Sequence, residues 1–242
     1  MIDEYKLALI FQSRESSEIV DKICNKLEEL TGENHKSIKL WLAIIERRAN
    51  EVENLYKDGV NLEYLPFAKI TPLIQTVVNG DINTLSILIS SGADINKPNN
   101  DEDQASPLYC SLGYYGQPID IKIVEFLLRN GSDANKPMFD EDTPMHMAHY
   151  YGHKEAIKLL LQYKGNINAQ NTEGKTPLHY LLETKNVNSV IKLEIIKEFL
   201  KNYNLTANDQ NRKTVIDYAN EHLSEALLLF TIKDVDCSLS DR

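Results

Sequence analysis

Three closely spaced histidines have the arrangement of a metal site. His146, His149 and His153 are separated by three and four residues, which would place all three imidazoles along one face of a continuous helix. Gly152 interrupts this arrangement because glycine commonly ends helices, so His153 is expected to lie beyond the helix end. We therefore predict structural roles for these histidines and assign the chain no metal and no cofactor.

A second motif resembles the end of a phosphate-binding loop. Gly174, Lys175 and Thr176 are consecutive, and such a loop uses its lysine and hydroxyl to hold phosphate and magnesium. The loop also requires a glycine five residues earlier, where this chain has Ala169, and a preceding strand that the local pattern does not indicate. The three residues are better interpreted as a turn that leads into the next helix.

The sequence shows no pattern typical of nucleophilic catalysis. It has no Gly-x-Ser-x-Gly motif, and Cys24, Cys110 and Cys237 are an odd number of cysteines at wide spacings. This cysteine usage, with an acidic start unlike that of a signal peptide, predicts a cytoplasmic, reducing environment. We predict that the chain is not an enzyme. The alternative of that class is a hydrolase whose carboxylates converge in an acidic cleft.

The charge of the chain is acidic and unevenly distributed. Its 242 residues include 36 acidic and 26 basic ones, which gives a formal net charge of −10. Residues 101–150 carry nine acidic residues against three basic ones and account for −6 of that total. Nucleic-acid-binding surfaces require clustered lysine and arginine, so this distribution argues against a nucleic-acid partner. The apolar run at 226–230 is too short for a membrane span.

An internal repeat determines the predicted architecture. A Thr-Pro-Leu pattern recurs at intervals of 35, 37, 33 and 38 residues, with a Gly- and Asn-rich phase between its copies. Residues 38–63 contain the second phase alone and are a degenerate first copy. The copies of the first pattern are Thr71-Pro72-Leu73, Ser106-Pro107-Leu108, Thr143-Pro144-Met145, Thr176-Pro177-Leu178 and, less closely, Thr214-Val215-Ile216.

Each copy is interpreted as two helices followed by a turn. Thr143 can cap a helix N-terminus, and Pro144 is tolerated in the first turn because its missing N–H would be unpaired there. Gly152 ends this short helix, and the apolar spacing of residues 156–161 indicates a second one. An Asn- and Asp-rich segment then predicts a projecting turn. Such a helix pair cannot bury its own apolar face, so the copies must stack.

These motifs resemble the ankyrin repeat. Thr143-Pro144-Met145-His146-Met147-Ala148 and Thr176-Pro177-Leu178-His179 stand close to the consensus of that family. The resemblance implies an all-α solenoid of stacked helix–turn–helix units with projecting turns and helical caps. The predicted domains are a helical N-terminal cap or extension at 1–37, about five repeats at 38–213, the first of them degenerate, and a C-terminal capping unit with a short tail at 214–242.

Two copies carry extra residues between their helices. The third has about four around residues 113–119, and the fifth has about seven around residues 185–193. Insertions in solenoids fall on loops. Residues 1–37 lie outside the repeat and carry an apolar helical stripe, which is interpreted either as a cap or as a partner-binding amphipathic helix.

The ankyrin resemblance implies that partners meet the turns and the exposed side of each first helix. Tyrosines there supply large contact area, and carboxylates at the rim favour a protein partner that presents Lys or Arg. Alternatively, one tyrosine of each pair packs against its neighbour and the acidic turns are solvated loops. Phe139 is the strongest candidate, because an aromatic residue at a turn tip has little to pack against. The predicted partner-binding residues are Asp101, Glu102, Asp103, Tyr114, Tyr115, Phe139, Asp140, Asp142, Tyr150 and Tyr151.

We therefore predict a non-catalytic protein–protein interaction module that binds its partner through the turns and inner helices of the middle repeats. The alternative within this class is an adaptor whose N-terminal segment, 1–37, is the main docking element. The chain has 20 lysines and only six arginines, a bias that suggests an AT-rich genome. This composition is similar to that of ankyrin proteins that intracellular bacteria deliver into host cells, so an effector role is one expectation.

Overall fold

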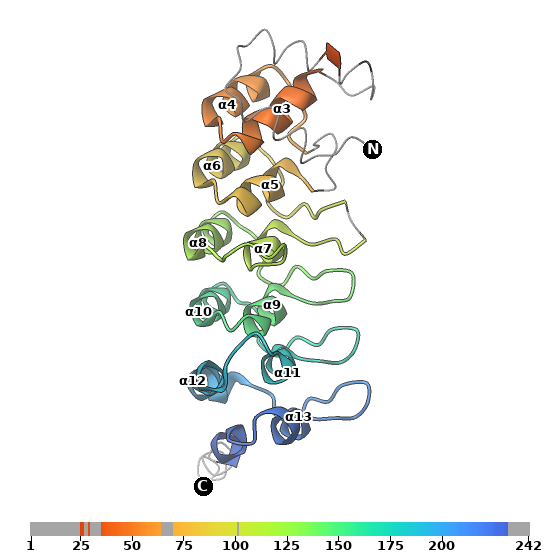
Figure 1. Cartoon of the computed structure of the whole chain (residues 1–242), viewed down its shortest axis with the longest axis vertical. Helices are drawn as coiled ribbons and strands as arrows, with labels where there is room; N and C mark the ends of the chain where they lie inside the picture. The colour runs from red at the N-terminus through yellow and green to blue at the C-terminus, as the bar shows by residue number, and fades with distance from the viewer. Residues whose placement is uncertain (1–24, 27–28, 30–34, 64–69, 101, 232–242) are drawn as a thin grey trace. The chain divides into compact units, whose positions relative to one another are not determined.

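The computed structural model describes residues 25–26, 29, 35–63, 70–100 and 102–231. The chain divides into two compact units, with the boundary between Cys110 and Ser111. Both units consist of helices joined by turns (Figure 1). Most of the predicted N-terminal cap and all of the tail after residue 231 lie outside the described residues, so the interpretations of segment 1–37 stay predictions.

The first unit contains two complete helix pairs. Helix α3 packs against both α4 and α5, and α6 packs against α4 and α5. Thr71 begins α5 by accepting a hydrogen bond from the Ile74 amide at 3.2 Å, and Asp81 caps α6 in the same way. The elements of this unit are α3 (His35–Ile45), α4 (Ala49–Lys57), α5 (Pro72–Asn79), α6 (Ile82–Ser90) and α7 (Pro107–Ser111), of which α7 reaches the unit boundary.

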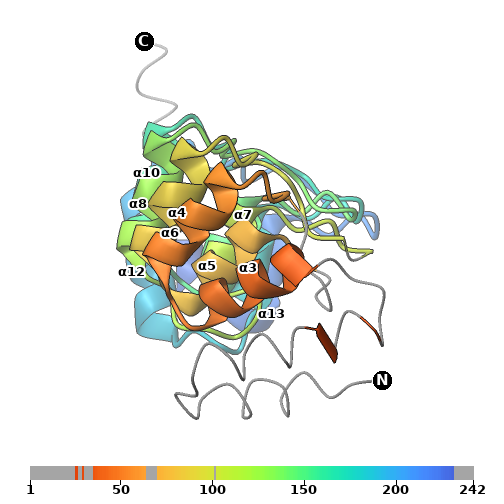
Figure 2. The same cartoon turned by 90° about the horizontal axis from the view of Figure 1, so that it is seen from above.

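The second unit is a stack of helix pairs with turns that project to one side (Figures 1 and 2). Its first helices, α9, α11 and α13, pack on one another in that order, while the second helices α8 and α10 pack together behind them. The elements are α8 (Ile121–Arg129), α9 (Pro144–Tyr150), α10 (Lys154–Gln162), α11 (Pro177–Glu183), α12 (Ser189–Phe199), the 3-10 helix η1 (Leu200–Asn202) and α13 (Val215–His222). Residues 226–231 are also helical.

Each first helix of this second unit begins with a reciprocal cap. The Thr143 amide donates to Nδ1 of His146 at 3.0 Å, and the Thr176 amide donates to Nδ1 of the equivalent His179 at 3.0 Å. The closing unit uses a carboxylate instead, because the Thr214 amide donates to Asp217 at 2.7 Å. This capping box pairs amides that the helix itself leaves unbonded, which explains the fixed spacing of Thr and the residue three positions later.

The projecting turns are short hairpins of one recurring geometry. Their central residues include one with positive φ, namely Glu141 at 64°, Gly174 at 74° and Arg212 at 62°. The hydrogen bonds that close them run from the amide of Met138 to the carbonyl of Asp142 (2.9 Å), from Asn171 to Lys175 (3.1 Å) and from Asp209 to Lys213 (3.0 Å).

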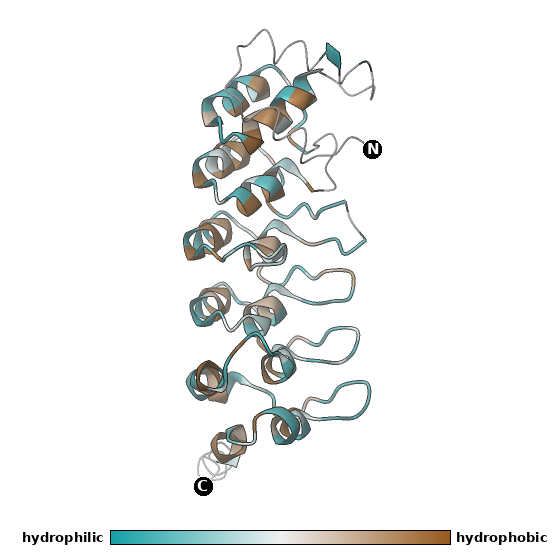
Figure 3. Ribbon diagram, in the orientation of Figure 1, coloured by the Kyte–Doolittle hydropathy of each residue, from teal (hydrophilic) through white to brown (hydrophobic). Residues whose placement is uncertain are grey.

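Backbone hydrogen bonds also join each turn to the next. The Thr172 amide donates to the Asp140 carbonyl at 2.9 Å, and the Gln210 amide donates to the Glu173 carbonyl at 2.8 Å. The turns of the second unit are therefore held in a row. Most of their residues are hydrophilic, whereas apolar residues concentrate on the helices (Figure 3). Ile157, Leu160 and Leu181 are completely buried there, and each such residue contributes about 1.5–3 kcal/mol to folding.

The insertion predicted for the fifth copy is shorter than expected. Helix α12 begins at Ser189, so the loop after α11 ends there, and the prediction of a loop extending to residue 193 is wrong. The remaining extra residues lengthen α12, which has 11 residues where α10 has nine. Val187 of this loop is buried, and burial of its side chain anchors the loop to the helices.

Candidate functional site

The tip of the fourth copy's turn carries an aromatic side chain that projects into solvent. Phe139 is 76% exposed, the highest value among the large apolar side chains of the described residues. Asp140 and Glu141 follow it in the turn and are also exposed. A solvated apolar ring next to carboxylates is unfavourable in the isolated protein and can become buried when a partner binds.

Asp142, a predicted contact residue in the same turn, is buried. Its side chain accepts hydrogen bonds from Nδ2 of the Asn171 side chain at 2.9 Å and from the Tyr180 hydroxyl at 2.7 Å. Burial raises the pKa of Asp142 to about 6, and the hydrogen bond from Tyr180 opposes that rise. Because both oxygens are used within the protein, we leave Asp142 out of the exposed surface and assign it to the contact between the two copies.

In each of the two tyrosine pairs, one ring is more exposed than the other. Tyr115 is 40% exposed and Tyr150 37% exposed, whereas Tyr114 and Tyr151 are partly buried. Within each pair the rings are in edge-to-face contact, with centroids 4.9 Å apart for Tyr114 and Tyr115 and 5.0 Å for Tyr150 and Tyr151. Edge-to-face contacts of this kind fix the rings in place.

Tyr151 packs against the preceding copy. A side-chain carbon added at Gly113 would lie 3.5 Å from its ring, and its other side stacks on His153 with centroids 5.7 Å apart. Tyr115 and Tyr150 therefore present more of their surface to solvent than Tyr114 and Tyr151 do.

The predicted acidic residues of the third copy belong to the first unit. Glu102 and Asp103 are exposed in its long turn, which is closed by a hydrogen bond from the Asn99 amide to the Ala105 carbonyl at 2.9 Å. Asp101 lies outside the described residues. The roles of these three acidic residues in binding stay a prediction.

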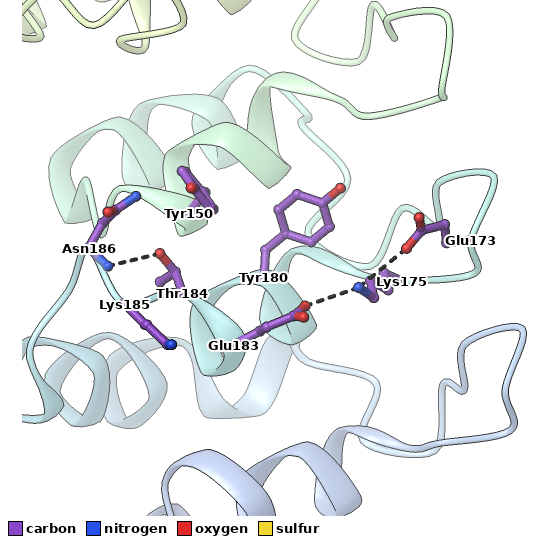
Figure 4. A pocket seen from close by; sticks show the side chains of 8 residues that line it. All are labelled: Tyr150, Glu173, Lys175, Tyr180, Glu183, Thr184, Lys185 and Asn186. Atoms are coloured by element: carbon purple, nitrogen blue, oxygen red, sulfur yellow. Dashed lines mark hydrogen bonds and ion pairs between the residues drawn. The ribbon is translucent and has the colours of Figure 1, made fainter.

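A pocket opens between α9 and α11, beside Tyr150 (Figure 4). Its volume is about 460 Å³, which is room for one or two side chains of a partner rather than for a folded element. The residues that line it are Tyr150, Glu173, Lys175, Tyr180, Glu183, Thr184, Lys185 and Asn186.

Ion pairs organise the acidic side of this pocket. Lys175 Nζ lies 3.2 Å from Glu173 and 3.0 Å from Glu183, and its side chain is only 17% exposed (Figure 4). Burial acts to lower the pKa of Lys175, but its hydrogen bonds to Glu183 and Glu173 outweigh burial and raise that pKa. The lysine therefore remains charged, and the two glutamates are held in place around it.

The loop that forms the opposite wall is fixed by a buried lysine. Lys192 of α12 reaches back so that its Nζ donates to the carbonyl oxygens of Leu182, at 2.7 Å, and Thr184. These carbonyls lie at the C-terminal end of α11, where the helix leaves acceptors unbonded. Lys192 therefore holds the start of the loop that supplies Thr184, Lys185 and Asn186 to the pocket.

Charge in the second unit is separated by face. We define the turn face as residues 139–151, 170–186 and 208–222, which are the turns and first helices. These residues include eight acidic and four basic side chains, a net charge of −4. The remaining residues of 111–231 include seven acidic and nine basic side chains, a net charge of +2. The turn face is therefore the acidic side of this unit.

The motifs considered for metal and phosphate chemistry are used for structure. His146 caps α9 and is within 3.0 Å of the Lys175 carbonyl, and burial lowers its pKa to about 4. His149 is completely buried, and His153 precedes α10. No group of three or more potential metal ligands occurs among the described residues. Gly174 and Lys175 form the turn that leads into α11, as predicted.

Sequence reasoning missed Tyr180 and Glu183, the central residues of the pocket. Their signal is the position they hold in the repeat. Tyr180 and Tyr218 both stand four residues after the capping threonine, and Glu183 and Glu221 both stand seven residues after it. Alignment of the copies position by position, rather than a search for acidic and aromatic clusters, would have identified both columns.

Comparisons with known proteins agree with this architecture. Residues 109–193 match the family described as ankyrin repeats, in three copies. The crystal structure of EF0377, an ankyrin repeat protein, superposes with a TM-score of 0.64 at 27% identity, over 75% of this chain and 90% of that one. Over 90 residues the chain is 34% identical to Rabankyrin-5 of Mus musculus, which covers 36% of this chain and 7% of that protein.

A second curated relative matches over a longer stretch of the chain. The human SMC5-SMC6 complex localization factor protein 1 is 28% identical over 174 residues, which cover 71% of this chain and 15% of that protein. The chain thus spans only a small part of these curated relatives. The capped helix pairs, the row of turns and these matches together establish that the chain is an ankyrin-repeat protein with the all-α ankyrin solenoid fold.

This family assignment defines a protein–protein interaction module, since ankyrin repeats imply protein partners. The fold is typically that of a non-enzymatic scaffold. No helix within the described residues is long and apolar enough to cross a bilayer.

Proposed function

We propose that this module binds its protein partner through the turn face of its second unit, with Phe139 as the anchor and a preference for segments that carry Lys or Arg. The observation that carries the proposal is the 76% exposure of Phe139 at the tip of a turn whose backbone is bonded to the next turn. A rigid, solvated aromatic side chain loses little conformational entropy when a partner covers it. Burial of such a ring is worth about 1.5–3 kcal/mol.

The charge of the turn face supports the choice of a basic partner. Its net charge of −4 contrasts with +2 on the rest of the unit, so a basic segment would be steered toward the turns and first helices. Such steering acts mainly on the association rate and weakens as salt is added.

Affinity capture from a lysate, with the whole chain as bait, tests this proposal. Partners captured by the wild type should be lost with Phe139→Ala and retained with Leu228→Ala. Leu228 is the matched control because it is also an exposed apolar residue, at 73%, but lies in the helical segment after α13, outside the turn face. Equal capture of every specific partner by the folded Phe139→Ala variant would contradict the proposal.

The alternative in which segment 1–37 is the main docking element makes the opposite prediction. Deletion of residues 1–37 would then abolish capture while leaving the repeats folded, and Phe139→Ala would have no effect. Exposure of Phe139 favours the turn face over this arrangement.

The hydrolase alternative requires carboxylates that converge in a pocket with raised pKa values. Among the described residues, burial raises the pKa of the Asp142 carboxylate, but its oxygens accept hydrogen bonds from Asn171 and Tyr180. Glu173 and Glu183, which do line the pocket, are both paired with Lys175. These contacts favour a binding role for the acidic groups over a catalytic one.

A cytoplasmic location and delivery into a host cell are separate proposals that rest on composition. The ratio of 20 lysines to six arginines motivates the proposal of delivery, whereas the three widely spaced cysteines and the acidic start motivate the cytoplasmic location. A reporter fused to the chain and followed during infection by the source organism tests delivery, and a reporter confined to the source cell would contradict it.

A further inference from the structure

Side chains from two recurring positions of the repeat meet at the pocket between α9 and α11. The residue before each capping threonine is Asp142 in the fourth copy, Lys175 in the fifth and Lys213 in the closing unit. The residue four positions after that threonine is Tyr180 in the fifth copy and Tyr218 in the closing unit. Tyr180 and Tyr218 are therefore equivalent residues of successive copies.

The ring of Tyr218 is covered by two lysines of the chain. Lys175 Nζ lies 5.9 Å from its centroid and Lys213 Nζ lies 6.0 Å from it. One lysine belongs to the preceding copy and the other to the same unit as the tyrosine. Ammonium groups at this distance are attracted to the electron-rich face of the ring.

Tyr180 stands at the position equivalent to Tyr218, but its ring lacks the covering lysines. In the preceding copy, the position equivalent to Lys175 is occupied by Asp142. Asp142 supplies no cation and instead accepts a hydrogen bond from the Tyr180 hydroxyl at 2.7 Å. Lys175, which belongs to the same copy as Tyr180, is paired with Glu173 and Glu183. Within the described part of the chain, no lysine or arginine lies over the Tyr180 ring.

The surroundings of Tyr180 are negative. Burial raises the pKa of its hydroxyl, and the charges of Asp142 and Asp140 raise it further. A hydroxyl that donates to a carboxylate makes its ring a better acceptor for a cation. The tyrosine lines a pocket that also contains Tyr150 and two carboxylates (Figure 4).

We propose that this pocket receives one arginine side chain of the protein partner, which lies against Tyr180 and bonds to Glu183 and Glu173. The inference rests on the proposed function and names the partner side chain that the pocket selects. Lys175 bonds only Oε2 of each glutamate, and within the described residues no hydrogen bond reaches Oε1 of either. A guanidinium can stack on a ring and bond to carboxylates at the same time, which an ammonium does less well.

The two lysines in the pocket wall do not exclude a further cation. The charge of Lys175 is matched by two glutamates, so the group carries a net negative charge. Lys185 is an exposed loop residue whose long side chain can extend into solvent.

The test is a titration of the whole chain with the peptide acetyl-Ala-Ala-Arg-Ala-Ala-amide, followed by NMR of the backbone amides of Lys185 and Asn186. Peptides with citrulline or lysine in place of arginine are the controls, since citrulline keeps the shape but lacks the charge. We expect the arginine peptide to bind about tenfold more tightly than the citrulline peptide. Equal binding of the citrulline or lysine peptide, or shifts confined to other residues, would overturn the proposal.

Two variants locate the binding within the pocket. Glu183→Gln should weaken binding of the arginine peptide about fivefold, whereas Glu221→Gln should not, because Glu221 makes the equivalent pair with Lys213 one copy later and lies outside the pocket. Asp142→Lys places the lysine of the repeat beside Tyr180 and should abolish peptide binding. Thermal unfolding shows whether the Asp142→Lys variant is folded. If that variant is unfolded, the Glu183→Gln result decides whether the arginine peptide binds in the pocket.

Failure of this proposal can be distinguished from failure of the proposed function. If Phe139→Ala abolishes partner capture while the arginine peptide shows no preference, the turn face stands and only the arginine pocket is overturned. If Phe139→Ala has no effect, the proposed function itself is contradicted.

Discussion

His149 and Tyr203, 54 residues apart in the chain, share a buried hydrogen bond in which Nε2 of the histidine lies 3.0 Å from the tyrosine hydroxyl. The other ring nitrogen, Nδ1, lies 2.8 Å from the Met145 carbonyl and must donate to it. Burial lowers the pKa of His149 and keeps the imidazole neutral, so Nε2 accepts from the Tyr203 hydroxyl. This pair joins α9 to the segment that follows η1.

Removal of the tyrosine hydroxyl should destabilise the protein. Tyr203→Phe leaves Nε2 of His149 buried without a donor, which is expected to cost about 1–3 kcal/mol. Urea unfolding at pH 7 measures the free energy of unfolding. Tyr163→Phe, at an exposed tyrosine, is the matched control and should change it by less than about 0.5 kcal/mol. An equal effect of both substitutions would contradict the assigned hydrogen bond.

The same histidine should make the protein less stable in acid. Burial lowers the pKa of His149 to about 3, below the ordinary value of about 6.5 that applies in the unfolded chain. The unfolded state then binds the extra proton, so stability falls as the pH drops from about 6.5 toward 3, by up to about 1.4 kcal/mol per pH unit. His149→Gln should reduce the slope of the unfolding free energy against pH by the equivalent of about one bound proton, measured by urea unfolding from pH 4 to 7. An unchanged slope would contradict a neutral, buried His149.

Asp142 should have the opposite pH dependence. Its pKa of about 6, raised by burial, exceeds the value near 3.9 of an unfolded aspartate, so the folded state holds this proton more tightly. Relative to Asp142→Asn, the wild type should lose up to about 3 kcal/mol of stability as the pH rises from 3.5 to 7. Asp140→Asn, at the exposed neighbouring position, is the control. A constant difference between wild type and Asp142→Asn across this range would refute the raised pKa.

Gly152 should tolerate no side chain because the pocket loop packs on it. A Cβ at this position would lie 2.9 Å from both γ carbons of Val187, whereas a Cβ at Gly80 would meet nothing within 4 Å. Both glycines have positive φ, 66° and 70°, so they share the backbone cost of about 1 kcal/mol. Gly152→Ala should therefore destabilise the protein by about 1–3 kcal/mol more than Gly80→Ala.

A second substitution identifies the cause of that difference. Val187→Ala removes the clashing carbons, so it should cost less in the Gly152→Ala background than in the wild type. Additive effects in urea unfolding would show that the strain at Gly152 does not come from this contact.

The repeated parts of the fold could be predicted because each reflects a local rule. Thr143 followed by Pro144 predicts the N-terminal cap of a helix, and the cap is present. Gly152 follows the end of α9 with a positive φ of 66°, as expected. The helix pairs follow from these signals and from the need to cover their apolar faces.

The parts that depend on side-chain direction could not be predicted in this way. The types of Asp140 and Asp142 gave no indication that the first is exposed and the second buried, because that difference arises from Tyr180, 38 residues after Asp142. The start of α12 at Ser189 was also missed, since Asn188 caps the helix through a contact of its own with the Ile191 amide. Both outcomes are set by contacts between residues rather than by composition.

The most direct test of the central claim is the affinity of a captured partner for the Phe139→Ala variant, measured by calorimetry with Leu228→Ala as control. If the turn face is the binding surface, Phe139→Ala should weaken binding at least about tenfold, since burial of the ring is worth about 1.5–3 kcal/mol. Leu228→Ala should leave the affinity unchanged. Equal affinities of the wild type and a folded Phe139→Ala variant would contradict the claim that Phe139 anchors the partner.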